Sequence, residues 1–234
     1  MKPASRAIDV KPTLSIVMPV LNEAVVIQAT LQALAPLRQR GAEVIVVDGG
    51  SSDATVALTA PFVDLVIDAP RGRARQMNAG AQHARADVLL FLHADTQLPA
   101  LADEQVAAAM ATGAVWGRFD VSISGSPVML RLVAALMNLR SRCTGIATGD
   151  QAVFVRRTTF EVVQGYPDQP LMEDIELSRR LRRHAAPVCL RARVTTSGRR
   201  WEARGVWRTI FLMWRLRWRY WRGESPAVLA DAYR

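Results

Sequence analysis

Runs of consecutive apolar residues recur along the first half of the chain, with polar segments between them. The runs at 14–20, 44–47 and 88–92 are built mainly from Val, Ile, Leu, Met and Phe. Such runs are typical of strands buried on both faces of a parallel sheet, where neither side of the strand meets solvent. Helical segments between the runs would complete right-handed βαβ units, so we predict an α/β fold.

The pattern gives the following elements. We expect strands at 14–20, 43–48, 65–67 and 88–92, and helices at 24–34, 53–58, 72–85 and 106–110, with Asn22 and Asp53 as helix caps. After Gly113 we expect an exposed-edge strand at 115–123, an apolar helix at 127–139, a strand at 152–155, a helix at 172–183 and a strand at 188–194. The simplest division is one domain over residues 1–198 and an extension over residues 199–234.

Four acidic residues stand in chain order at the ends of these elements. Asp48 closes the second strand, Asp95 follows the fourth, and Glu173 and Asp174 open a polar helix. In open α/β sheets, ligands bind in the crevice beyond the carboxyl ends of the strands, so Asp48 and Asp95 are expected to share one crevice. A single aspartate at a strand end is often merely solvated, but the ordered set favours a functional site.

The charge balance narrows the classes of partner. The chain has 30 Lys and Arg against 21 Asp and Glu, a formal net charge of +9. This excess favours an anionic partner, such as a phosphate-bearing ligand, an anionic membrane surface or nucleic acid. Cys143 and Cys189 have no metal-ligand spacing and suggest a reducing compartment rather than a disulfide framework. No signal peptide is expected in residues 1–11, and no transmembrane helix anywhere.

Short motifs follow the strands. The sequence is PVLNE at 19–23 and DGGSSDAT at 48–55, where glycines let the backbone approach a ligand closely, although Ser51, Ser52 and Asp53 would equally suit an ordinary helix start. Further along come RGRARQMNAG at 71–80, FLHADT at 91–96, GDQ at 149–151 and MEDIEL at 172–177. Together, over about residues 14–200, these segments resemble family 2 glycosyltransferases of the GT-A fold. The combination of residues 71–73 with 93–95 most resembles a small subgroup of that family and says little about the substrate.

The resemblance implies a mostly parallel, Rossmann-like sheet flanked by helices and a hexosyltransferase-type enzyme that uses a nucleotide-diphospho-sugar. It also implies which residues face the donor nucleotide: Pro19, Leu21, Glu23, Asp48, Gly50, Arg71, Arg75, Asn78 and Ala94. UDP is favoured as the nucleotide because an aspartate after the second strand can accept from the uracil imide N–H. A guanine also presents N–H donors, so this argument does not exclude GDP.

The metal motif departs from the family pattern. The family usually begins it with Asp, whereas this chain has His93, so Asp95 is the one sure carboxylate ligand. Mg²⁺ and Mn²⁺ prefer oxygen ligands and keep several waters, so one carboxylate and two phosphates suffice to hold the ion. We therefore expect Mg²⁺ or Mn²⁺ as cofactor, and His93 is more often a polar residue at a strand end than a ligand.

Glycosyl transfer also needs a base that takes the proton of the attacking hydroxyl. By family position, Asp174 is the candidate base, and Glu173 would orient the acceptor or support Asp174. A single base opposite the leaving group implies inversion at the anomeric carbon. The alternative is that these carboxylates only complement the helix dipole at a helix start.

The extension is rich in Trp and Arg. Trp207, Ile210, Phe211, Trp214, Trp218 and Trp221 are spaced to share one helix face, beside a stripe formed by Arg204, Arg208, Arg215, Arg219 and Arg222. Helices of this kind lie in the membrane interface and attract anionic headgroups. We expect a protein of the cytoplasm that sits peripherally on the inner face of the cell membrane, with a lipid or lipid-linked acceptor. The alternative is a helix packed on the domain, with its arginines snorkelling at the edge.

Two other functions compete with this interpretation. A sugar-phosphate nucleotidyltransferase would have a related sheet, but it needs a Gly-rich, Lys-bearing loop after the first strand, which PVLNE at 19–23 lacks. The other is a basic protein that binds a membrane or RNA without turnover. Nucleic acid is not the expected partner, because no nucleic-acid-binding module is recognisable in the sequence.

Overall fold

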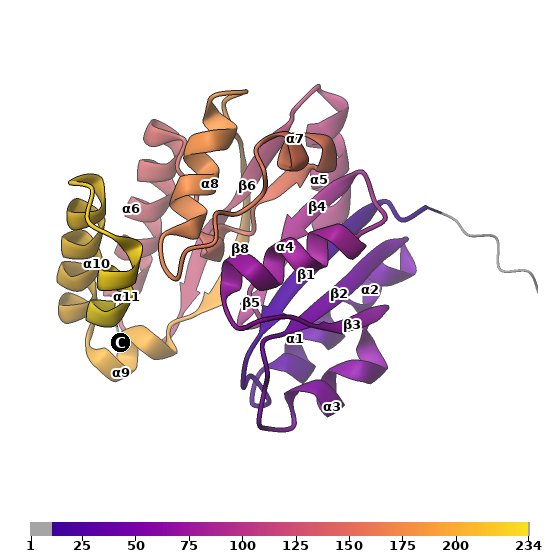
Figure 1. Ribbon diagram of the computed structural model, residues 1–234, viewed down its shortest axis with the longest axis horizontal. Helices are drawn as coiled ribbons and strands as arrows, with labels where there is room; N and C mark the ends of the chain where they lie inside the picture. The colour runs from indigo at the N-terminus through magenta and orange to yellow at the C-terminus, as the bar shows by residue number, and fades with distance from the viewer. Residues whose placement is uncertain (1–10, 234) are drawn as a thin grey trace, which may run out of the picture.

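The computed structural model describes residues 11–233, apart from the side chains of residues 200 and 204. Most of the segment in which no signal peptide is expected therefore lies outside the described residues. One eight-stranded sheet runs through the molecule, in the order β3-β2-β1-β4-β7-β6-β8-β5 (Figure 1). The strands are β1 (Leu14–Val20), β2 (Ala42–Asp48), β3 (Leu65–Asp68), β4 (Val88–Phe91), β5 (Thr96–Gln97), β6 (Trp116–Ser124), β7 (Phe154–Arg156) and β8 (Val188–Ser197).

Helices cover both faces of the sheet. They are α1 (Ile27–Ala33), α2 (Ala35–Gln39), α3 (Thr55–Thr59), α4 (Arg73–His83), α5 (Ala102–Ala111), α6 (Met129–Thr144), α7 (Arg157–Val162) and α8 (Glu173–Arg182), with α9 (Arg199–Arg204), α10 (Val206–Trp221) and α11 (Pro226–Tyr233) at the C-terminal end. Helices α1, α2, α5 and α6 contribute to one apolar core, and α4, α7 and α8 to the other. Gly80 of α4 permits close packing, because a Cβ there would lie 2.4 Å from Val17 Cγ1.

The first half of the sheet is parallel, as predicted. β1 pairs in parallel with both β2 and β4, and β2 pairs in parallel with β3. The register places Val20 beside Asp48 and Asp48 beside Asp68, so three strands end together. β1 and β2 are buried along their whole lengths, which is what their uninterrupted apolar runs indicate.

The prediction of an exposed-edge strand at 115–123 is wrong. β6 lies inside the sheet, antiparallel to β7 and parallel to β8, and nearly all of its residues are buried. Two of its alternating polar residues, Arg118 and Asp120, are buried too, because they are paired: Arg118 donates to Asp120, and Arg142 of α6 donates to the other Asp120 oxygen at 2.6 Å. Arg118 is 0% exposed.

Helix starts are the other point of difference. Asn22 does not cap α1, which begins five residues later at Ile27 with Val26 at the cap position. Asn22 has φ 54° and its side chain instead accepts from the Ser52 N–H at 2.8 Å. The N-cap of α3 is Ala54 rather than Asp53, although Asp53 does accept from the Thr55 N–H at 3.0 Å.

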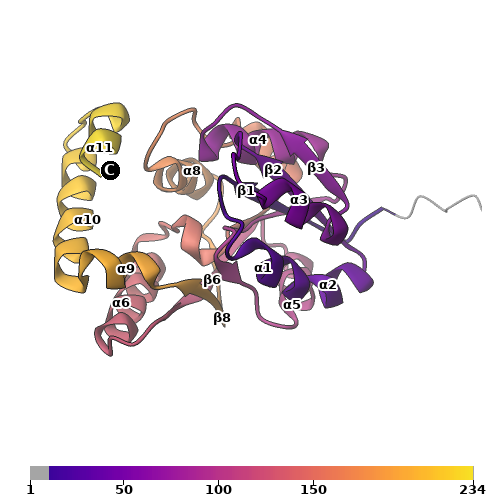
Figure 2. The same cartoon turned by 90° about the horizontal axis from the view of Figure 1, so that it is seen from below.

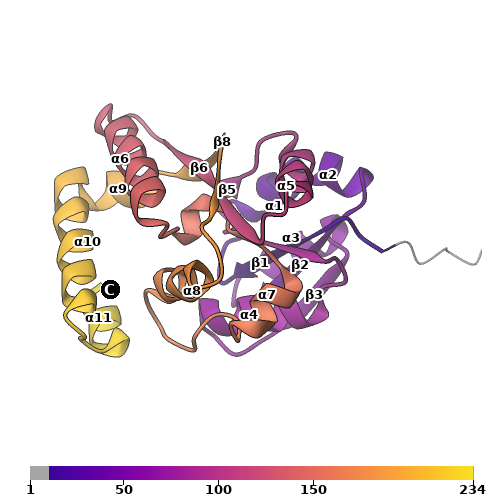
Figure 3. The ribbon, with the colours of Figure 1, turned by 90° about the horizontal axis from the view of Figure 1, so that it is seen from above.

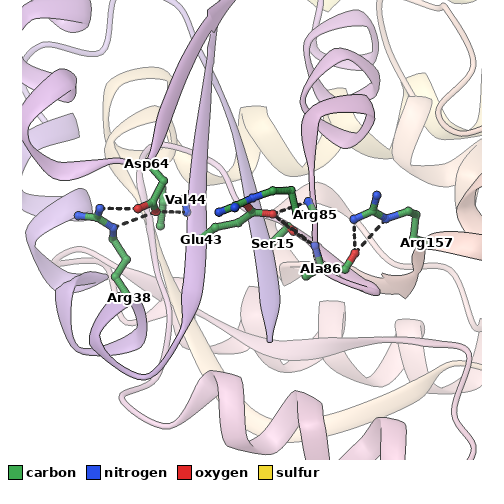
Figure 4. Close-up of polar contacts among 8 residues, drawn as sticks. All are labelled: Ser15, Arg38, Glu43, Val44, Asp64, Arg85, Ala86 and Arg157. Atoms are coloured by element: carbon green, nitrogen blue, oxygen red, sulfur yellow. Dashed lines mark hydrogen bonds and ion pairs between the residues drawn. The ribbon is translucent and has the colours of Figure 1, made fainter. Parts of the chain in front are cut away.

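The amino ends of the strands are held by polar contacts (Figure 4). The buried Glu43 carboxylate of β2 accepts from the Ser15 hydroxyl and from Arg85 Nε, the latter at 3.0 Å. Asp64 accepts from Arg38 and, at 2.8 Å, from the Val44 N–H. The acids at this edge therefore have cationic partners within the chain.

The C-terminal helices stand at the end of the molecule farthest from β3 (Figures 2 and 3). Leu216 of α10 and Leu229 of α11 form a small separate core with Leu171 and Met172, the two residues that precede α8. Within the described residues, no helix is both long and apolar enough to cross a membrane. Cys143 and Cys189 are free thiols.

Candidate active site

Two loops meet at the carboxyl ends of β1 and β2 and are bound to each other. The Asn22 N–H donates to Ser51 Oγ at 2.9 Å, and the Glu23 N–H donates to Thr55 Oγ1 at 2.8 Å. Asp48, which is 4% exposed, accepts from the N–H groups of Gly50 and Ser51 at 2.9 and 2.8 Å. Asp48 thus orders the turn that follows β2, while its contact with a nucleotide base stays a prediction.

Gln76 of α4 joins the same strand ends, and the sequence reasoning did not single it out. Its side-chain Nε2 donates to the backbone carbonyls of Val20 and Val47, both at 2.8 Å. A Cβ added to Gly49 would lie 3.0 Å from the Gln76 amide, so the turn passes directly over it. The sequence signal that could have identified Gln76 is its position: an amide one helical turn after Gly72, at the entry to α4.

The other residues predicted to face the donor nucleotide differ in how exposed they are and in the contacts that they already make. Arg71 is exposed at the entry to α4. Arg75 is exposed as well and forms an ion pair with Asp168 at 2.7 Å. The Asn78 amide binds the backbone of Tyr166 with both of its groups, at 2.8 and 2.9 Å. Asn78 therefore fixes the loop before α8. Pro19 and Ala94 are buried, Leu21 is half-buried, and Gly50 is exposed with φ 89°.

Asp95 and Glu23 share one electrostatic neighbourhood. Burial and then the negative charge of Asp95 raise the pKa of Glu23, against the positive charges of Arg199 and Arg73. Arg199 Nη2 is 4.0 Å from the Glu23 carboxylate. His93, two residues before Asp95, has its Nδ1 atom 3.5 Å from Asp150 Oδ1. The loop after β1 and the loop after β4 therefore meet, as the strand order requires.

The residues present fit a divalent cation. Two carboxylates, Glu23 and Asp95, repel each other here, and a cation would relieve that repulsion. Among residues 11–233, no three His, Cys, Asp or Glu side chains converge into a complete metal cage. A bound Mg²⁺ or Mn²⁺ would therefore take its remaining oxygen ligands from phosphates and water, which suits these ions.

Glu173 begins α8 and Asp174 follows it, and His93 acts electrostatically on both carboxyl groups as it does on Glu23. The Asp174 carboxylate accepts from the Gly149 N–H at 2.9 Å and from the Ile175 N–H at 2.8 Å. Burial raises the pKa of Asp174 in spite of these two hydrogen bonds. Burial and the neighbouring Asp174 charge raise the pKa of Glu173, which is 5% exposed. The preceding residue, Met172, takes the left-handed conformation with φ 65° and turns the chain into the helix.

The direction of the pKa shift separates three carboxyl groups from the paired acids elsewhere in the described residues. Lys11 holds the pKa of Asp87 below its ordinary value, and Arg40 does the same for Asp103. Among the described carboxyl groups, those with a clearly raised pKa are Glu23, Glu173 and Asp174. Partly or fully buried carboxylates with raised pKa values are candidates for a functional site, because structural acids are normally paired.

Comparison with known sequences agrees with this arrangement. The family model described as "Glycosyl transferase family 2" matches residues 15–157, more than half of the chain. The chain is 28% identical over 247 residues to the probable glycosyltransferase YdaM of Bacillus subtilis, covering 93% of this chain and 56% of that protein. It is also 37% identical over 94 residues to a PGL/p-HBAD biosynthesis glycosyltransferase of Mycobacterium bovis, covering 37% of each. The chain thus spans little more than half the length of YdaM.

Solved structures share the fold. S. aureus TarS 1–349 in complex with UDP superposes with a TM-score of 0.65 at 18% identity, over 79% of this chain and 60% of that one. The mannosyltransferase PcManGT from Pyrobaculum calidifontis, in complex with GDP-Man and Mn²⁺, gives 0.63 at 21% identity, over 96% and 70%. At these identities the likeness establishes the fold: a mixed α/β sheet of the GT-A type.

Proposed function

Because the chain belongs to glycosyl transferase family 2, we propose that it moves a sugar from a nucleotide-diphospho-sugar to an acceptor hydroxyl with inversion. The observation that carries the proposal is that Glu23, beside Asp95, and Glu173, beside Asp174, all have carboxyl groups within the electrostatic reach of Arg73 or His93, and that the pKa values of Glu23, Glu173 and Asp174 are raised. One side of this crevice suits a metal-bound diphosphate, and the other offers a base. Glycosyl transfer needs both.

The donor would bind over the joined loops at 21–24 and 48–55. UDP is the favoured nucleotide: the TarS structures contain UDP or UDP-GlcNAc, although PcManGT contains GDP-Man. Asp95 would hold Mg²⁺ or Mn²⁺, which neutralises the diphosphate leaving group when bound. Arg73, whose charge acts on both Glu23 and Glu173, lies where it would add to that neutralisation.

Asp174 would take the proton from the acceptor hydroxyl as that oxygen attacks the anomeric carbon. Its raised pKa makes it a stronger base than an ordinary aspartate, and the N–H groups of Gly149 and Ile175 fix its orientation. Glu173 would support this base through its negative charge. The attack comes from the face opposite the leaving group, so the anomeric configuration inverts.

The C-terminal helices suggest where the enzyme works. The outward side chains of α10 are exposed to a degree unusual for such residues: Trp207 61%, Phe211 68%, Trp214 69%, Trp218 57% and Trp221 80%. Arg208, Arg215 and Arg222 are exposed beside them, and Arg222 lies over the Trp218 ring at 5.1 Å. This outer face of α10 combines apolar rings with positive charge, and it supports peripheral binding to an anionic cytoplasmic membrane surface with a lipid or lipid-linked acceptor.

Donor binding tests the enzymatic proposal directly. Thermal-shift measurements with UDP, GDP, dTDP and CDP, each with and without Mn²⁺, should show stabilisation by one nucleotide that depends on the metal. The corresponding nucleotide sugar should then release that nucleoside diphosphate on incubation. If no nucleotide stabilises the protein with either Mn²⁺ or Mg²⁺, the proposal is wrong.

Membrane binding is tested on the outer face alone, because the inner face packs against Leu171 and Met172. Reversing Arg208, Arg215 and Arg222 to Glu should weaken sedimentation with anionic vesicles by on the order of 100-fold or more, at roughly 1 kcal/mol per basic residue. The matched control reverses Arg183, Arg191 and Arg193, three exposed arginines of the body. Equal loss in both triple variants would mean that net charge, and not this helix, drives binding.

A further inference from the structure

Arg140, near the C-terminal end of α6, is a buried-tipped arginine that the proposed reaction leaves unused. Its Nε and Nη2 atoms are buried and have no hydrogen-bond partner. Burial lowers the pKa of its guanidinium, and the negative charge of Asp174 opposes that shift. Buried N–H groups of a cation that have no partner destabilise the fold, so the two such atoms of the partly buried Arg140 call for an explanation.

The neighbouring arginines do have acceptors for their terminal nitrogens. Arg142, two residues later on the same helix, donates to Asp120 at 2.6 Å. Arg118, below α6 on β6, donates to the other oxygen of Asp120 and to the Asn138 carbonyl. The Nε of Arg118, like that of Arg140, has no partner. The chain therefore supplies acceptors to the terminal nitrogens of Arg118 and Arg142 but none to the Nη2 of Arg140.

The position of Arg140 indicates what would occupy the gap. Its charge acts on Asp174, and the proposed base would act on the acceptor. The Asp174 carboxylate already accepts from two backbone N–H groups. An oxyanion is the natural partner of a guanidinium fork, because two N–H groups can donate in parallel to one phosphate or carboxylate.

We propose that Arg140 binds an oxyanion carried by the acceptor, a phosphate or a carboxylate group, within reach of the hydroxyl that Asp174 deprotonates. This inference rests on the proposed glycosyl transfer and adds the chemical class of the acceptor. The oxyanion completes the hydrogen bonds of Arg140 and compensates its buried charge. A neutral acceptor of the same shape leaves the guanidinium unpaired, so the site discriminates against it.

The experiment uses the full chain saturated with UDP and Mn²⁺, which keeps added phosphate out of the donor site. Calorimetric titrations compare glycerol 3-phosphate with neutral glycerol, and sedimentation compares phosphatidylcholine vesicles with and without phosphatidic acid. The variants are Arg140→Gln, which removes the charge, and Arg140→Lys, which keeps the charge but loses the fork. Arg131→Gln, exposed on the same helix, is the matched control. Circular dichroism verifies that every variant is folded.

We expect Arg140→Gln to weaken binding of the phosphate-bearing probe at least tenfold, and Arg140→Lys to weaken it less, while UDP affinity is unchanged. Loss confined to glycerol 3-phosphate identifies a soluble phosphate group, and loss confined to phosphatidic acid identifies a lipid headgroup. If Arg140→Gln binds both probes as the wild type does, or only shifts the pH profile of transfer, Arg140 merely tunes Asp174 and the inference is wrong. Failure of the wild type to bind any of UDP, GDP, dTDP and CDP with Mn²⁺ or Mg²⁺ would instead overturn the proposed function; if another of these nucleotides binds, it replaces UDP in the titrations.

Discussion

Replacing Gln76 with Met should loosen the donor crevice without emptying it. Met has nearly the same length and helix propensity as Gln, but it cannot donate. The variant loses the two hydrogen bonds of 2.8 Å that join Gln76 to the carbonyls of Val20 and Val47, and a long one of 3.4 Å that Gln76 accepts from the Gly72 N–H, which at that length adds little. The Val20 carbonyl keeps a partner, because it also accepts from the Gly49 N–H at 3.0 Å. The expected loss in the free energy of unfolding is therefore that of the lost hydrogen bonds, without the larger penalty of leaving the Val20 carbonyl unpaired.

Each such bond contributes about 0.5–1.5 kcal/mol net, so the free energy of unfolding should fall by about 1–3 kcal/mol. For a chain of this size that corresponds to a melting temperature lower by about 2–12 °C. Nucleotide affinity should fall as well, because Gln76 holds the ends of β1 and β2 under the turn at 49–52.

Urea unfolding gives the free energy of unfolding, and calorimetry with UDP and Mn²⁺ gives the affinity. Gln82→Met is the matched control, since Gln82 is exposed on the same helix. A Gln76→Met variant within about 0.5 kcal/mol of wild type, the scatter of ordinary surface substitutions, would refute the reasoning.

Three further substitutions test the site. Asp95→Ala should reduce nucleotide affinity measured with Mn²⁺ to the value without metal; calorimetry showing no change would remove Asp95 as the ligand. Asp174→Asn should keep donor affinity and lose transfer by roughly 10²–10⁴-fold. Because burial raises the pKa of Asp174, the transfer rate of the wild type should decrease on acidification at a higher pH than it would with an ordinary aspartate as the base. Glu173→Gln should unfold at a higher temperature than wild type near pH 7. Burial raises the folded pKa of Glu173, so its ionised form costs stability above that pKa, and the advantage should vanish in acid; a constant advantage across pH would contradict this cause.

The adjacency of the loops that follow β1, β2 and β4 was predictable because strand ends and chain order carry most of the information. An uninterrupted apolar run predicts a buried parallel strand, and parallel strands bring their carboxyl ends to one edge. That logic correctly joined the segments around Asp48 and Asp95, whose strands flank β1. It could not reveal that the Asn78 amide binds the Tyr166 backbone. The partner lies 88 residues away, and the sequence around Asn78 does not indicate it.

β6 shows why alternation misleads. Arg118, Asp120 and Ser122 alternate with apolar residues as on a solvent-facing strand, yet Arg118 and Asp120 are buried under α6. Alternation reports that one face is polar and says nothing about what covers that face. Here Arg118 binds Asp120 and the Asn138 carbonyl, so a polar face packs against a helix instead of water. Asn22 likewise has a partner that its local sequence does not indicate: its side-chain oxygen accepts from the Ser52 N–H and not from the first turn of a helix.

The C-terminal extension had two competing interpretations, a membrane-surface helix and a packed helix, and α10 combines features of both. Its inner residues Leu212, Leu216 and Tyr220 pack with Leu171 and Met172, directly before the proposed base. Of the predicted aromatic face, Ile210 turns inward to the core, while the Trp rings remain exposed. Arg219 likewise leaves the stripe and pairs with Glu224, and the Arg204 side chain lies outside the described residues. Removing the extension would therefore uncover the segment that carries Glu173 and Asp174, so loss of activity on truncation would not diagnose membrane binding. Only substitutions confined to the outer face separate attachment from support of the active site.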